Sequence, residues 1–403
     1  MKKQFIAGTV LLASLGLASA QGLYDIAPND EAKESSPLKW NAGLSLGWDD
    51  NVTPTSVANS GDETTYVDAY VGASLVSITP QTTWDVFGRV GGHYYFDAPK
   101  ATGDDLTGNG RLGISWAHRV SERLRFISSN YVAYELEPNY NEGFASDRQL
   151  EEYLNYQSDN AVGYRWSERF ATYTGIKYRG IDYGSSASNN DRTTLTLYNQ
   201  FRYSASAQTV WTFDYRYSET DSSGAAGDST NNYLLLGVEH RFSPNSVLAL
   251  KAGVQMRDVN GGKDSDSPFV EAALRTRVND QFSVRAFARY SVEDYGTSFA
   301  GFTYDTNNTL RVGVSADYVV SPTLTLNAGV NYVMTEMEDA RGFVPAGFAS
   351  ADTDLINLYL GFSYKVNDGL FLTGSYNWTD SDSDLTTRNY DRNRASLGVR
   401  VTF

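Results

Sequence analysis

The sequence contains no cysteine among its 403 residues. Disulfide frameworks, thiolate metal sites and thiol nucleophiles are therefore excluded. Histidine is nearly as scarce, with only His93, His118 and His240. Because nucleophilic catalysis needs a base beside a serine or aspartate and no convincing pair of this kind is present, the sequence predicts neither an enzyme nor a bound metal or other cofactor.

Long apolar runs are also missing. Beyond the first twenty residues, no stretch approaches the length of uninterrupted apolar sequence that a transmembrane helix requires. At the N-terminus, Lys2 and Lys3 precede a mostly apolar run from Phe5 to Leu17, and Ala18-Ser19-Ala20 fits a small-residue cleavage site. These residues predict an export signal that is cleaved after Ala20.

Positive charge is in the minority. The chain has 33 Lys and Arg against 48 Asp and Glu, a formal charge of -15. Removing Lys2 and Lys3 with the signal changes this to -15 - 2 = -17, because residues 1–20 contain no acid. Nucleic acid is therefore excluded as a partner, since neutralising its phosphates requires a basic surface.

The dominant pattern is an alternation of apolar and polar residues with a period of two. In the last strand, Ala395, Leu397, Val399, Val401 and Phe403 alternate with Arg394, Ser396, Gly398, Arg400 and Thr402. Residues 40–49, 248–257, 282–293 and 324–334 repeat this pattern. Such repetition is typical of an all-β transmembrane barrel with lipid outside and water inside. The aromatic content of 13% fits girdles at the two membrane interfaces.

Connections of two lengths separate the predicted strands. Short turns are expected near 79–81, 120–122, 167–168, 205–208, 243–245, 279–281, 321–323 and 367–369. Longer loops are expected near 50–63, 97–106, 137–149, 180–191, 219–230, 258–266, 294–306, 337–352 and 379–391. They predict a closed antiparallel barrel of eighteen strands, with short periplasmic turns, longer extracellular loops and both termini on the periplasmic side. Sixteen strands is the alternative, because residues 124–136 and 150–166 alternate less clearly.

A soluble sandwich, propeller or solenoid is the competing architecture. It is disfavoured because the apolar faces are nearly free of charge and no amphipathic helices are present to cover them. The predicted organisation is a signal peptide at 1–20, a short periplasmic leader at 21–37 and one barrel domain at 38–403. The leader lacks alternation and contains acidic residues beside two prolines.

Charged side chains concentrate on the polar faces of the strands. The predicted pore-lining residues are Asp68, Asp85, Arg89, Arg111, Arg125, Lys177, Arg202, Asp214, Arg216, Arg257, Arg275, Arg285, Arg289, Arg311 and Arg394. Most other acids lie in the long loops, so an acidic mouth would lead into a mostly basic lumen. Two interpretations stay open: arginine–carboxylate pairs brace the wall, or the arginines attract anionic and polar solutes.

The predicted loop at 337–352 is unusually apolar. Phe343, Val344 and Phe348 make it a candidate constriction loop that folds into the lumen, although it could equally cap the rim. Without such an obstruction, a barrel of eighteen strands is wide enough for an aqueous channel.

Two segments carry a resemblance to a known family. Trp40-Asn41-Ala42-Gly43-Leu44-Ser45-Leu46-Gly47-Trp48 resembles the first strand of outer-membrane β-barrel porins, and is similar to the branch that includes barrels of exopolysaccharide export loci. Val399–Phe403 resembles the aromatic-ended last strand recognised by the outer-membrane assembly machinery. The resemblance implies an outer-membrane location, contact with outer-membrane lipid and a porin-like channel, and supplies no site residues. Porins are commonly trimers, but no single outward patch of this sequence requires a homo-oligomer.

The sequence thus predicts an outer-membrane channel for passive diffusion of small hydrophilic solutes, with inward arginines biasing it toward anions. One alternative is an outer-membrane conduit for exopolysaccharide export. The other is a non-conducting structural or adhesive surface barrel that acts through its acidic loops.

Overall fold

The computed structural model describes residues 35–52, 63–99, 103–136, 152–183, 191–223, 227–243, 245–294, 298–299, 302–385 and 388–403. The first strands are β1 (Ser36–Asp49), β2 (Thr64–Ile78), β3 (Thr82–Tyr95), β4 (Leu106–Arg119), β5 (Leu124–Glu135), β6 (Tyr153–Arg165), β7 (Phe170–Tyr183), β8 (Arg192–Ser204), β9 (Thr209–Ser222) and β10 (Ser229–Ser243). The others are β11 (Ser246–Val259), β12 (Ser265–Arg277), β13 (Phe282–Val292), β14 (Ser298–Phe299), β15 (Phe302–Ser321), β16 (Leu324–Gly342), β17 (Ala351–Lys365), β18 (Leu370–Ser383) and β19 (Tyr390–Thr402). No helix long and apolar enough to cross a membrane occurs in this part of the chain.

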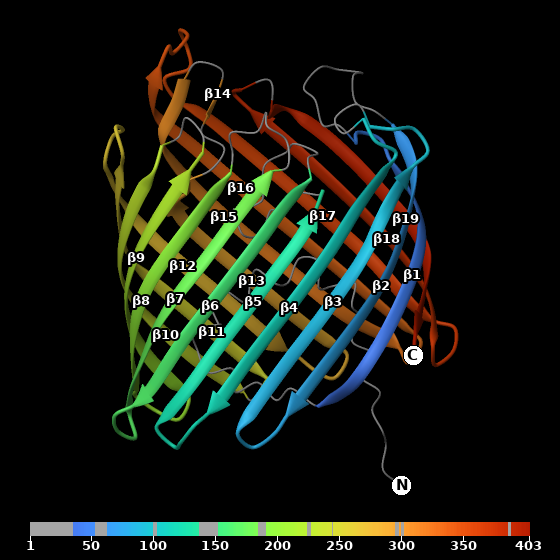
Figure 1. Cartoon of the computed structure of the whole chain (residues 1–403), viewed down its shortest axis with the longest axis horizontal. Helices are drawn as coiled ribbons and strands as arrows, with labels where there is room; N and C mark the ends of the chain where they lie inside the picture. Colours follow the sequence, from blue (N-terminus) through green and yellow to red (C-terminus); the bar gives the residue numbers. More distant parts are fainter. Residues whose placement is uncertain are drawn as a thin grey trace.

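The strands form one antiparallel sheet that closes on itself. Each long strand pairs with its neighbours in sequence, and β1 pairs with β19 in a register that runs from Asn41–Thr402 to Asp49–Arg394. The two-residue β14 pairs with β15, while β13 pairs directly with β15. The described residues therefore contain eighteen long strands in a closed barrel (Figure 1). The predicted fold class and strand number are confirmed.

Short turns join the strands at one end of the barrel. All eight fall between the strand pairs that the sequence predicted, at the lower end in Figure 1. Serine, threonine and asparagine close them by accepting backbone hydrogen bonds, as where Leu124 N donates to Ser121 Oγ at 3.0 Å. The C-terminus lies at the same end, because Phe403 exchanges backbone hydrogen bonds of 2.8 and 2.9 Å with Trp40.

The extracellular ends of several strands are longer than predicted. The loop expected at 337–352 begins inside β16, which continues to Gly342 by pairing with the extended start of β15. The actual connection is residues 343–350. Alternation ends before the strand does because both faces of this hairpin lie beyond the apolar band, whereas backbone pairing needs no apolar face.

The N-terminal boundary also differs slightly. β1 begins at Ser36, which pairs with Val76, two residues before the predicted start of the barrel at Leu38. The predicted signal peptide and most of the predicted leader lie outside the described residues.

The curvature of the sheet distinguishes its two faces. Leu46, Leu236 and Leu360 are 57, 68 and 56% exposed, whereas Lys251 and Asp214 on the opposite face are 2 and 1% exposed. Side chains on a concave face are crowded together, so the buried polar face is the lumen and the apolar face is the outside. This arrangement agrees with the predicted alternation.

Tyrosines on the lumen face pack flat on the neighbouring strand. The ring of Tyr70 occupies the space that a Cβ atom on Gly43 would need, and Tyr198 does the same at Gly175. Glycine is required at these positions because it alone lets a ring approach the backbone this closely. These tyrosines therefore form part of the wall.

Candidate functional site

The lumen wall formed by β8 to β12 contains a chain of buried charges. Lys251 Nζ lies 3.1 Å from Asp214 Oδ2, and Gln200 donates a 2.6 Å hydrogen bond to the same carboxylate. Arg202 donates to both oxygens of Glu239 at 2.7 and 2.6 Å. Asp214 is on β9 and Lys251 is on β11, with β10 between them. Side chains two strands apart can meet in this way because both lie on the lumen face of the sheet. Such ion pairs, rather than an apolar core, hold this part of the wall together.

Further charges converge at the extracellular end of β13. The last residue of the strand and the two that follow it, Val292–Asp294, form what we call the acidic segment. Gln255 on β11 accepts a hydrogen bond from Val292 N and donates one to Val292 O, both at 3.0 Å. The side chain of Gln255 thus replaces a strand partner and holds the acidic segment against the lumen face of β11.

The acidic segment is open on its β12 side because the pairing of β13 with β12 ends early, whereas Val292 still pairs with Asn308 on β15. The last β12–β13 pair is Val270–Tyr290. Continuing this register would place Pro268 opposite Val292, and proline has no N–H to contribute to a ladder. The end of β13 is therefore free to bend toward β11.

Both carboxylates of the acidic segment bind arginines of the wall. Arg311 on β15 donates to Glu293 at 2.9 and 3.0 Å, and Arg289 on β13 donates to it at 2.6 Å. Arg257 on β11 donates to Asp294 Oδ1 at 2.7 and 3.0 Å. The segment thereby connects β11 to β13 and β15 across β12, which separates them in the sheet.

Asp294 reaches furthest across the wall. Its carboxylate also accepts hydrogen bonds from Ser229 on β10 at 2.8 Å and from Thr220 on β9 at 3.4 Å. Burial alone would raise the pKa of Asp294, but the charge and hydrogen bonds of Arg257, with Ser229 and the charge of Arg179, lower it below its ordinary value. Asp294 is therefore an anion at neutral pH and anchors the segment electrostatically.

A second charge cluster lies at the closing seam of the barrel. Arg392 on β19 binds both oxygens of Asp49 on β1, with contacts of 2.5 to 3.1 Å. Arg394 lies 3.4 Å from the same carboxylate. Asp49 is 1% exposed, so this carboxylate is buried beneath the two arginines that contact it.

The wall between β2 and β5 contains simpler pairs. Arg89 lies 3.2 Å from Asp68 and stacks over the Tyr70 ring at 3.8 Å from its centroid. His93 Nδ1 is 3.4 Å from the other oxygen of Asp68. Arg111 forms an ion pair with Glu135.

The remaining predicted pore-lining residues occupy the same face. Arg216 lies 3.4 Å from Glu271, and Arg285 is 3.8 Å from Asp317. The side chains of Asp85, Arg125, Lys177 and Arg275 are half-buried. Whether any of these residues contacts a solute stays a prediction.

The candidate constriction loop lies at the extracellular ends of β15 to β17. Val344 and Phe348 pack against a cluster that includes Tyr304 and Met337, and Tyr304 donates a hydrogen bond to Phe348 O at 2.9 Å. Phe343 is 84% exposed. The described contacts of this loop are at the rim, whereas the acidic segment contacts inward side chains of the wall.

Sequence reasoning omitted several residues of these clusters from the site. Asp49, Arg392, Glu293 and Asp294 were not among the predicted pore-lining residues. The alternation of residues along this strand could have identified Glu293 as a pore-lining residue, because it lies at an even spacing from Arg285 and Arg289 and so on the same face. No sequence signal identifies Asp294, because it follows the last residue of β13 and takes its position from distant partners.

Carboxylates are shared between arginines in the described lumen. Arg289 and Arg311 share Glu293, and Arg392 and Arg394 share Asp49. Arg400 contacts the Ser363 hydroxyl at 3.3 Å and the Phe371 ring, with no carboxylate within ion-pair distance among the described residues. No group of histidines and carboxylates in the described ranges is arranged to hold a metal ion.

The C-terminal third of the chain matches a known family. Residues 263–403 match the family model described as "Putative beta-barrel porin 2". These residues run from the β11–β12 loop to the end of β19 and thus include the acidic segment and one side of the seam. The match agrees with the porin resemblance of the sequence and contains nothing on exopolysaccharide export. Comparison of the sequence with curated proteins gives no match.

Several solved structures are similar in overall shape. OpdK from Pseudomonas aeruginosa, solved with vanillate, is 13% identical, with 91% of this chain and 99% of that chain covered and a TM-score of 0.48. OccAB4 from Acinetobacter baumannii is 13% identical, with coverages of 92% and 99% and a TM-score of 0.44. A BenF-like porin from Pseudomonas fluorescens Pf-5 is 13% identical, with coverages of 91% and 99% and a TM-score of 0.45.

Proposed function

We propose that this protein is an outer-membrane porin-like channel through which small hydrophilic solutes diffuse passively, with a preference for anions. The observation that supports it most is a closed barrel whose polar face carries a series of arginines, several of which share one carboxylate. Charged groups along a water-filled route set the selectivity of a pore. The porin family match over residues 263–403 supports the same function.

The pore-lining residues divide between two roles in this proposal. Asp214 and Lys251 neutralise one another in the buried wall and brace it. The arginine pairs at Glu293 and Asp49 attract anions. The acidic segment narrows the route on the side of β9 to β11, while Phe343, Val344 and Phe348 remain a second predicted constriction.

We also infer the cellular setting. Residues 1–20 direct export and are removed after Ala20, and the leader at 21–37 is periplasmic. The aromatic C-terminal residue Phe403 is recognised by the outer-membrane assembly machinery, and the apolar outer face contacts outer-membrane lipid. No observation in the described residues favours polysaccharide export or a purely structural barrel.

The test is reconstitution of the purified barrel in a planar bilayer. We expect stable conductance steps and, in a KCl gradient, a reversal potential of the sign that indicates anion preference. Replacing Arg285 and Arg289 with glutamate should shift the reversal potential toward cations, because each substitution changes the local charge by two. A folded barrel that never conducts would exclude the channel, and an unchanged potential in the double variant would leave these arginines with a bracing role only.

A further inference from the structure

Four uncharged polar side chains face outward near the middle of β5 and β6. Ser128 and Asn130 follow Phe126 on the outward face of β5, and Ser158 and Asn160 occupy the same face of β6. They form a closed ring of hydrogen bonds. Ser128 donates to Asn160 at 2.7 Å, Asn160 to Ser158 at 2.9 Å, Ser158 to Asn130 at 2.7 Å and Asn130 to Ser128 at 2.9 Å. We call these four residues the outer polar cluster.

The cluster lies at the level of the hydrocarbon. On the same outward face, Tyr134 and Tyr156 lie on its extracellular side, and Tyr164 and Trp166 lie on its periplasmic side. Aromatic residues of this kind mark the two interfaces of a barrel with lipid. On β7 and β8, Thr174 and Asn199 extend the polar surface, joined by a hydrogen bond of 2.7 Å.

Outside β5 to β8, no described strand has outward amides at this depth. The central outward positions of the remaining long strands are apolar, aromatic or glycine. Outward polar residues such as Asn232 and Asn393 lie nearer the extracellular ends, where they accept hydrogen bonds from Tyr215 and Tyr376. The outer polar cluster is therefore not explained by a general tolerance of polar groups on this surface.

The ring leaves part of the cluster without partners. Each asparagine amide carries two N–H donors, and the ring uses one of each. The second donors of Asn130 and Asn160 have no described hydrogen bond within the chain, and lipid hydrocarbon cannot accept one. A partner at this depth must therefore offer uncharged hydrogen-bonding groups.

We propose that the outer polar cluster is the centre of a two-fold interface with a second copy of this chain. Asparagine and serine both donate and accept, so the cluster is complementary to itself. Since outward amides at this depth are confined to β5 to β8 in the described outer face, a second copy can satisfy the cluster only by presenting the same side of its barrel. Contact of one patch with the identical patch generates a closed dimer.

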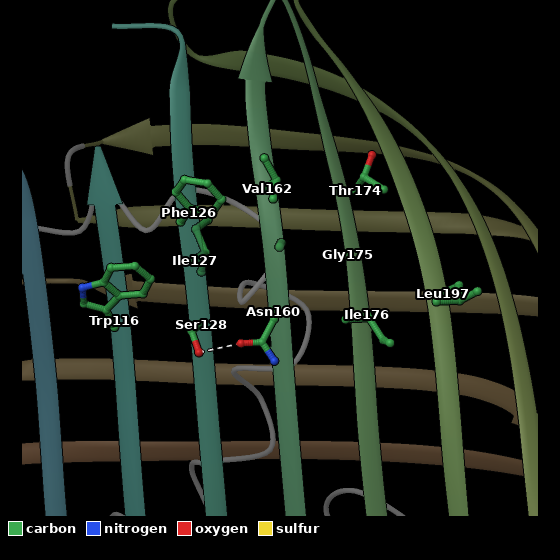
Figure 2. A pocket seen from close by; sticks show the side chains of 11 residues that line it. Trp116, Phe126, Ile127, Ser128, Asn160, Val162, Thr174, Gly175, Ile176 and Leu197 are labelled. Carbon is green, nitrogen blue, oxygen red and sulfur yellow. Dashed lines mark hydrogen bonds between the residues drawn. The ribbon is translucent and has the colours of Figure 1, made fainter. Parts of the chain in front are cut away.

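The surroundings of the cluster suit such a contact. Ser128, Asn160 and Thr174 lie in an open hollow of the outer wall together with Phe126, Val162, Ile176 and Leu197, as Figure 2 shows. These apolar side chains are 36 to 48% exposed. A hollow that combines small, polar and apolar residues lets the two walls approach closely, as such residues do where membrane segments associate. The proposal depends on the barrel lying in lipid and not on conduction.

The absence of cysteine makes the test direct. In the variant Val162→Cys, the introduced thiol is the only one in the chain, and a two-fold contact places it near its own symmetry mate. Oxidation of outer membranes should give a product of twice the chain mass. The matched control is Leu358→Cys on β17, which is similarly exposed and should stay monomeric. Light scattering of the unmodified protein in mild detergent should give two chains.

A second variant separates a specific contact from random collision. Replacing Asn130 and Asn160 with leucine in the Val162→Cys chain should lower dimer formation about fiftyfold, the size expected when four hydrogen bonds, two from each chain, are lost within a membrane. Replacing Asn393 with leucine should leave it unchanged, since that outward amide is bonded to Tyr376 away from the cluster. Folding of each variant is checked by gel electrophoresis, in which a folded barrel changes its mobility after it has been heated. A monomer by light scattering, equal cross-linking at Leu358→Cys, or a cross-link to a different protein would each overturn the proposal.

Discussion

The anchoring of Asp294 makes a quantitative prediction. The variant Asp294→Ala removes a carboxylate that accepts two hydrogen bonds from Arg257 and one each from Ser229 and Thr220. A hydrogen bond to a charged group contributes about 1.5–3 kcal/mol. Because the Asp294 side chain is 23% exposed, solvent screening limits the combined loss of the free energy that anchors the segment to about 3 kcal/mol. This value corresponds to roughly a hundredfold rise in the released form of the acidic segment.

The assay is single-channel recording in a planar bilayer. Released segments should produce more frequent switching between conductance levels, because Gln255 and Glu293 still tether the segment to the wall. The matched control is Asp368→Ala, in a periplasmic turn where the carboxylate is 94% exposed and pairs only locally with Lys365. If the Asp294→Ala channel keeps the levels and switching rate of the unmodified protein, the acidic segment does not border the route.

The same anchor should respond to acid. The pKa of Asp294 is lowered in the folded protein, so its stabilising effect is complete above the ordinary value of 3.8 and is lost as the pH falls through the lowered value. The unmodified channel should therefore acquire the rapid switching of Asp294→Ala only below about pH 3.8, and the Asp368→Ala channel should behave in the same way. Switching that begins near neutral pH would assign the response to another group.

Two further predictions concern the shared carboxylates. The variant Glu293→Gln removes one negative charge beside Arg289 and Arg311, so the reversal potential in a KCl gradient should shift toward anions; no shift would remove these groups from the ion path. The variant Asp49→Asn leaves Arg392 at the closing seam without its carboxylate, and breaking such a buried pair costs about 3–5 kcal/mol. The temperature at which the folded barrel converts to the unfolded form in gel electrophoresis should fall, and an unchanged temperature would show that backbone pairing alone closes the seam.

Much of the architecture could be predicted from local sequence. Each strand must present apolar residues outward and polar residues inward, and this requirement is visible at every second position, as in Leu397, Val399 and Val401. The turns are equally local, because a serine such as Ser121 bonds to the backbone three residues away. Strand number, turn positions and the direction of the arginines followed from these short-range rules.

The segments that alternated poorly have a physical explanation in the structure. Residues 124–136 and 150–166 contain Ser128, Asn130, Ser158 and Asn160 at outward positions where the other strands carry apolar residues. What appeared in the sequence as weak strand signals is a hydrogen-bonded cluster on the outer wall. The sequence alone could not show this, because each serine bonds to an asparagine of the adjacent strand, about thirty residues away.

The candidate site was determined only by the tertiary structure. The sequence by itself determined which side chains face the lumen, since facing depends on parity within one strand. Which of them neutralise one another depends on contacts between distant residues, such as Asp49 with Arg392 across the closing seam and Asp294 with Ser229 across the wall. The proposed preference for anions depends on those contacts, because they decide which arginines share a carboxylate.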